Sequence, residues 1–167
     1  MKKIFLLIVS VFFVLNSCAD KMDTPAIMID TSPIELSNIN QTLLLQLINQ
    51  VRSKDQECGD TFRYSVEPLV WNKLLERLAY NQSKDMEDNQ FFSHTSSQGL
   101  SLSERLDYTD YTWKNASENI AQGLFAEKSV IDGWLKSPKH CNNIMNGSFT
   151  QVGIAKVGNH WTQIFTD

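Results

Sequence analysis

A proline in the middle of a helical pattern, Pro138, strongly constrains how the C-terminal third of this chain can fold. Residues 133–137 have the character of the end of a helix, and residues 139–145 that of a second short helical turn. Because proline lacks an N–H and fixes φ, it ends one helix and is tolerated in the first turn of another. His140 therefore comes at the start of the second turn, where its side chain can point away from the helix into a cleft.

The N-terminus has the pattern of an export signal. A basic start is followed by an apolar run over residues 4–15, which is too short for a membrane span of about 20 residues. We interpret residues 1–17 as a cleavable signal peptide. The sequence Leu-Asn-Ser-Cys that ends at Cys18 resembles a bacterial lipobox, so Cys18 is predicted to carry a lipid and to become the mature N-terminus. Ordinary secretion, with Cys18 as an unpaired thiol, is the alternative.

The remaining chain divides into a tether and one domain. Residues 18–36 are polar and marked by prolines, which predicts a flexible tether, and residues 37–167 have the length of one globular domain. The chain has 15 basic and 19 acidic residues, for a net charge of −4, and it has no basic run. This balance argues against nucleic acid as a partner and leaves a lipid as the membrane anchor. The predicted location is the cell envelope, at the outer membrane or the cell surface.

The two other cysteines, Cys58 and Cys141, are predicted to form a disulfide. An exported protein meets a compartment that permits disulfides, and with Cys18 assigned to a lipid these two make an even pair. In the chain-entropy model, a closed loop of this length contributes roughly 4.5 kcal/mol. Two buried free thiols are the alternative, and a two-cysteine metal site fits less well because neither cysteine lies in a Cys-x-x-Cys pair.

Apolar residues recur at helical spacing in three stretches. The first is residues 37–54, the second starts after Pro68 and ends near Asn89, and the third is residues 126–137. Residues 101–104 have the form of a capping box, which predicts a further short helix.

The C-terminal pattern predicts strands. Residues 152–158 and 161–165 are expected to pair as a hairpin. Residues 60–66 fit either an edge strand or an irregular loop. Trp134 and Trp161 are assigned to the core. Helices first and strands last, without β-α-β alternation, predict an α+β fold.

Two histidines and a carboxylate are the candidate site residues. His94 and His140 each follow a signal that ends a helix, and Glu118 lies in a predicted loop of small polar residues. Imidazole nitrogens and a carboxylate are a sufficient ligand set for zinc, and the same groups could carry out acid–base chemistry. Spacing alone does not bring them together, because no two stand at i, i+4 positions. His160, at the hairpin turn, is expected to be a solvated or strand-end residue.

Several spaced motifs together resemble the CAP superfamily, and within it the bacterial SCP-like extracellular domains. They are Phe91-Phe92-Ser93-His94, Ser117-Glu118-Asn119-Ile120-Ala121, the stretch 134–145, Val152-Gly153-Ile154-Ala155 and Trp161-Thr162-Gln163-Ile164-Phe165. The resemblance covers about residues 43–165. It implies a three-layer α-β-α sandwich with a cleft lined by His94, Glu118 and His140.

One departure from the family pattern concerns the ligand set. Eukaryotic members commonly add a second acidic residue in the helix before the final histidine, whereas residues 134–137 here are Trp, Leu, Lys and Ser. Three protein ligands and a water would still complete a zinc site. Asn119 is expected to brace Glu118 or simply to stabilise a turn. The Cys58–Cys141 bond would attach the His140 turn to the end of the first helix.

The first hypothesis is a lipid-anchored cell-envelope domain whose cleft binds a divalent metal, a lipid or a glycan, and the resemblance supports this range of ligands without choosing among them. The alternative is metal-assisted or acid–base hydrolysis of envelope material by His94, Glu118 and His140. The sequence has no nucleophile elbow and no His-Glu-x-x-His run, and Ser93 and Ser137 lie near histidines only in sequence. Binding is therefore the preferred hypothesis, and a scaffold with a vestigial cleft is the third.

Overall fold

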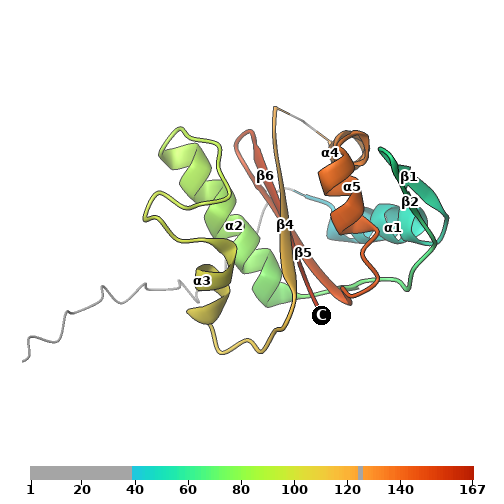
Figure 1. Ribbon diagram of the computed structural model, residues 1–167. Helices are drawn as coiled ribbons and strands as arrows, with labels where there is room; N and C mark the ends of the chain where they lie inside the picture. Colours follow the sequence, from blue (N-terminus) through green and yellow to red (C-terminus); the bar gives the residue numbers. More distant parts are fainter. Residues whose placement is uncertain (1–38, 124–125) are drawn as a thin grey trace, which may run out of the picture. The chain divides into compact units, whose positions relative to one another are not determined.

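The computed structural model of the protein describes residues 39–123 and 126–167 (Figure 1). The predicted signal peptide (1–17), the tether (18–36) and the lipidation site at Cys18 lie outside the described residues. Within the described part, no helix is long and apolar enough to cross a bilayer.

A mixed four-stranded sheet lies at the centre of the domain, in the strand order β3-β5-β6-β4. β5 and β6 form the predicted antiparallel hairpin, β4 pairs antiparallel with β6 along its whole length, and β3 pairs parallel with the start of β5. β4 is therefore an edge strand. The bounds are β3 Val70–Trp71, β4 Ala116–Gln122, β5 Gln151–Val157 and β6 His160–Thr166.

Helices cover both faces of this sheet (Figure 1). Two buried clusters show this: one joins the sheet to α1, α4 and α5, and the other joins it to α2 and α3. Alternation along β6 sends Phe165 into the first cluster and Ile164 into the second. The helices are α1 Gln41–Arg52, α2 Lys73–Asp88, α3 Leu102–Asp107, α4 Glu127–Lys136 and α5 Pro138–Ile144.

This arrangement confirms the predicted α+β fold and its three α-β-α layers. Trp134 and Trp161 are each 1% exposed in the first cluster, so their assignment to the core is confirmed as well.

Capping side chains explain where the helices begin. α1 starts at Gln41, later than predicted, because the Asn40 side chain accepts a hydrogen bond from the Leu43 N–H. α2 likewise starts at Lys73, because Asn72 caps it. The predicted capping box is present at the start of α3, and Pro138 occupies the first turn of α5.

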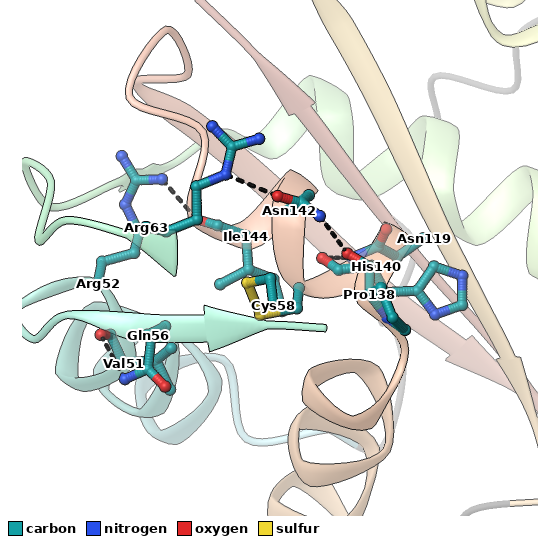
Figure 2. Close-up of a disulfide and its surroundings, with 11 residues drawn as sticks. Val51, Arg52, Gln56, Cys58, Arg63, Asn119, Pro138, His140, Asn142 and Ile144 are labelled. Carbon is teal, nitrogen blue, oxygen red and sulfur yellow. Dashed lines mark hydrogen bonds between the residues drawn. A yellow bond between two sulfur atoms is a disulfide. The ribbon is translucent and has the colours of Figure 1, made fainter. Parts of the chain in front are cut away.

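A small hairpin occupies the stretch whose structure the sequence left open. β1 (Gln56–Cys58) pairs antiparallel with β2 (Thr61–Arg63). The predicted Cys58–Cys141 disulfide is present and joins this hairpin to α5 (Figure 2). Its anchor is thus the β1–β2 hairpin, and the expectation that it attaches α5 to the end of the first helix was wrong.

A buried arginine holds the other end of α5. The fully buried Arg52 guanidinium donates to the carbonyl oxygens of Ile144, Asn146 and Phe149, at 2.6, 3.1 and 3.1 Å. The first of these bonds is drawn in Figure 2. Burial lowers the pKa of Arg52 to about 10. Because these three backbone carbonyls accept hydrogen bonds from its guanidinium, Arg52 fixes the chain between α5 and β5.

Candidate functional site

Glu118 lies on the edge strand β4, and the expectation that it sits in a loop was wrong. It stands opposite Ile164 of β6 in the ladder. Small polar neighbours suggested a loop, but they pair along the full strand because β6 offers a complete partner. The Glu118 side chain is only 3% exposed, so its carboxylate needs protein partners in place of water.

Two side chains supply those partners. His94 Nδ1 lies 2.8 Å from Glu118 Oε1, and Arg105 Nη2 lies 2.8 Å from Oε2. Arg105 is 9% exposed, so it forms a buried ion pair that gives the carboxylate its countercharge. The carboxylate accepts a hydrogen bond from His94 Nδ1. In the neutral imidazole, Nε2 of this half-exposed ring then carries an available lone pair.

The backbone around His94 is fixed by the helices of the same layer. Gln82 of α2 donates to the Ser93 carbonyl at 2.9 Å, and Arg105 of α3 donates to the His94 carbonyl at 3.2 Å. Arg105 therefore holds both the carboxylate and the loop that carries the imidazole.

His140 lies where the sequence predicted it, in the first turn of α5. Figure 2 shows it beside Pro138 and Asn119. The Asn119 side chain donates to the His140 carbonyl at 3.2 Å and to Gln163 Oε1 at 2.9 Å. Asn119 was expected to brace Glu118 or a turn, and its side chain instead attaches the His140 backbone to the sheet.

The site lies where the two helical layers meet at the edge of the sheet. Consecutive side chains of a strand point to opposite faces. Glu118 therefore contacts His94 on the α2–α3 side, and Asn119 contacts α5 on the other. Burial lowers the pKa of His140, and the positive charges of His94 and Lys139 lower it further.

The groups of this site that remain available to ligate a metal ion are the imidazoles of His94 and His140. Both oxygens of Glu118 face protein donors, so the carboxylate orients His94. Within residues 39–123 and 126–167, no three His, Cys, Asp or Glu side chains are grouped to hold a metal ion. Two imidazole nitrogens would leave the other coordination positions to water or a ligand. The three-ligand set of His94, Glu118 and His140 stays a prediction.

His160 belongs to a different cluster. Its side chain is 4% exposed, with Nδ1 2.8 Å from Glu87 Oε2 and Nε2 3.0 Å from the Gln122 amide nitrogen. The hydrogen bond from the Asn159 N–H, followed by that from His160, lowers the pKa of Glu87. His160 does start β6, but the expectation that it is solvated was wrong.

Sequence reasoning missed Arg105. An arginine on a short polar helix is typical of a solvated cation, and nothing local marks this one as buried. The neighbouring capping box gives the start of α3 but not the burial of Arg105.

A family model decides the family to which this fold belongs. The model for the CAP, or cysteine-rich secretory protein, family matches residues 45–165. The chain belongs to the CAP family. A crystal structure of an extracellular protein with an SCP domain from Bacillus anthracis is 30% identical, with a TM-score of 0.66. It covers 75% of this chain and 39% of that one. An outer surface protein of Borrelia burgdorferi shares the fold, at 21% identity and a TM-score of 0.64, over 75% of this chain and 90% of that one.

Curated relatives of this CAP domain come from Bacillus subtilis. The uncharacterized membrane protein YlbC is 28% identical over 131 residues, which are 78% of this chain and 35% of that protein. The uncharacterized protein YkwD is 33% identical over 105 residues, which are 62% of this chain and 41% of that protein. The chain thus spans well under half the length of either relative, and the likeness concerns one part of each.

Breaking the buried ion pair of this CAP domain is expected to destabilise it. Arg105→Met should lower the free energy of unfolding by about 3 kcal/mol, because it leaves Glu118 buried without its countercharge. The double variant Arg105→Met/Glu118→Leu should recover much of this loss. Urea unfolding measures both. Lys128→Met, which breaks an exposed pair with Asp132, is the control, expected to cost about 0.5 kcal/mol. Equal losses for Arg105→Met and Lys128→Met would contradict the ion pair's role.

His140 should make the stability depend on pH. Its pKa in the folded state is lowered from the ordinary 6.5, so below that pH the unfolded state binds more protons. Stability that is present above 6.5 is then lost as the pH falls. Urea unfolding from about pH 8 to pH 5 should show this loss, and His140→Gln should flatten it. Identical slopes for the two proteins would rule out His140 as the source.

Proposed function

We propose that this CAP domain is exported and binds a divalent metal ion between His94 and His140. The contact of Glu118 with His94 Nδ1 carries the proposal, because it leaves Nε2 as the ligating nitrogen. The lowered pKa of His140 supports it, since a neutral imidazole is the form that binds metal. Zinc is the preferred ion because it accepts nitrogen ligands in tetrahedral sites with open positions.

The ligand beyond the ion is an envelope molecule in this proposal. His94 and His140 would hold the zinc ion, which would supply Lewis-acid chemistry toward an oxygen atom of a lipid or a glycan. The chain's own contribution is to hold the two imidazoles in place. Arg105 and Glu118 orient one of them, and Asn119 holds the backbone of the other.

Export and lipid anchoring are the second part of the proposal. The signal pattern of residues 1–17 and the Cys58–Cys141 disulfide both suit an oxidising compartment. The Bacillus anthracis relative is an extracellular protein, which supports the same location for this chain. We place the lipid on Cys18, so that the tether (18–36) connects the domain to a membrane.

Zinc binding should depend on both histidines. In a protein of residues 19–167, His94→Ala and His140→Ala should each abolish binding of one zinc ion in a calorimetric titration. Glu118→Gln should weaken binding by about 10- to 100-fold, because it removes the group that orients His94. His160→Gln is the matched control, since that histidine belongs to another cluster. Unchanged zinc content in both alanine variants would refute the site.

The lipid anchor should depend on Cys18 alone. The wild-type protein is expected in the membrane fraction of cells and in the detergent phase of a two-phase extraction. Cys18→Ala should move it to the aqueous phase, because it removes the residue that carries the lipid. Cys58→Ala/Cys141→Ala, which removes only the disulfide, should stay with the membrane. A Cys18→Ala protein that still sediments with membranes would contradict the anchor.

A further inference from the structure

We infer that Asn119 is a positioning residue that sets the place of His140 relative to His94. The inference rests on the proposed metal site and concerns a residue that touches neither imidazole ring in that proposal. Asn119 is fully buried. Its amide nitrogen donates to the His140 carbonyl and to Gln163 Oε1, and its Oδ1 accepts from Asn143 Nδ2 at 2.8 Å.

The bond to the His140 carbonyl, which can only accept, is enough to set the orientation of the Asn119 carboxamide. Gln163 stands directly opposite Asn119 on β6, and Asn143 approaches from α5. A flipped amide would turn its oxygen toward that carbonyl and lose this buried hydrogen bond. The nitrogen is therefore held pointing at the His140 carbonyl.

Asn119 directly follows Glu118 in the chain, and this is why its bond to the His140 carbonyl matters for the site. The preceding residue, Glu118, holds His94 from the opposite layer. Two consecutive residues of one paired strand thus connect to both histidines, and the strand geometry sets their relative positions. The disulfide of Cys141 restrains the same turn, but it attaches α5 to the β1–β2 hairpin. Asn119 attaches it to the strand that carries Glu118.

Substitutions at two residues that contact Asn119 distinguish a positioning role from a general contribution to the stability of the core. Gln163→Met breaks the bond across the strands, and Asn143→Ala breaks the bond to Asn119 Oδ1. Both leave the Asn119 amide free to donate to His140. Asn119→Leu keeps the shape of the side chain and removes that donor.

The experiment compares zinc affinity and stability for these variants of residues 19–167. Asn119→Leu should weaken zinc binding about 10-fold or more, as for other groups that orient metal ligands. Gln163→Met and Asn143→Ala should stay within about threefold of wild type, even where they lose as much stability. The inference would be overturned if the loss of zinc affinity in each variant were simply proportional to its loss of folding stability.

A measurement without metal keeps the inference testable if the wild type binds no zinc, which would refute the proposed function alone. Hydrogen exchange of metal-free protein should then show faster exchange at the α5 amides in Asn119→Leu than in Gln163→Met. Equal rates would overturn the inference. If Asn119→Leu does not fold, the inference is tested by the hydrogen exchange of the Asn119 carboxamide protons in the wild-type protein. They should exchange as slowly as the α5 amides, and rapid exchange would overturn the inference.

Discussion

The site depends on a property of any extended chain, which is that consecutive side chains point to opposite faces of a sheet. β4 is an edge strand whose two faces meet different helical layers. Glu118 turns toward the layer of α2 and α3, and Asn119 toward the layer of α5. Two consecutive residues of β4 are thereby bonded to two histidines that are far apart in the sequence. Pairing with β6 along the whole of β4 makes this edge a rigid reference.

Burying a carboxylate at this edge has a cost, and its partners explain why the cost is tolerated. A charged group removed from water is destabilising unless it is paired and hydrogen-bonded. Arg105 supplies the charge, and His94 supplies a second donor. The consequence for function is that the imidazole is oriented by a group inside the protein while it stays half exposed. On the other side, Arg52 and the disulfide hold α5 in place, so neither histidine depends on a free loop.

Much of this could be predicted from the sequence because the signals were local. The capping box at 101–104, the proline at the start of α5 and the alternating apolar residues of β5 and β6 each act within a few residues. The cysteine pair followed from the two cysteines left for an exported domain, and the positions of His94 and His140 followed from spaced motifs. Arg105, the burial of His160 and the strand around Glu118 could not be predicted this way. Each depends on a partner more than ten residues away: Glu118 for Arg105, Glu87 for His160 and β6 for β4.

The most direct test of the account is a crystal structure of residues 19–167 grown with zinc, with the ion located by its anomalous scattering. The account predicts one ion within about 2.0–2.1 Å of His94 Nε2 and of a ring nitrogen of His140. Glu118 should remain on His94 Nδ1 in that structure. An ion bound to one of these histidines alone, or held elsewhere on the domain, would contradict the account.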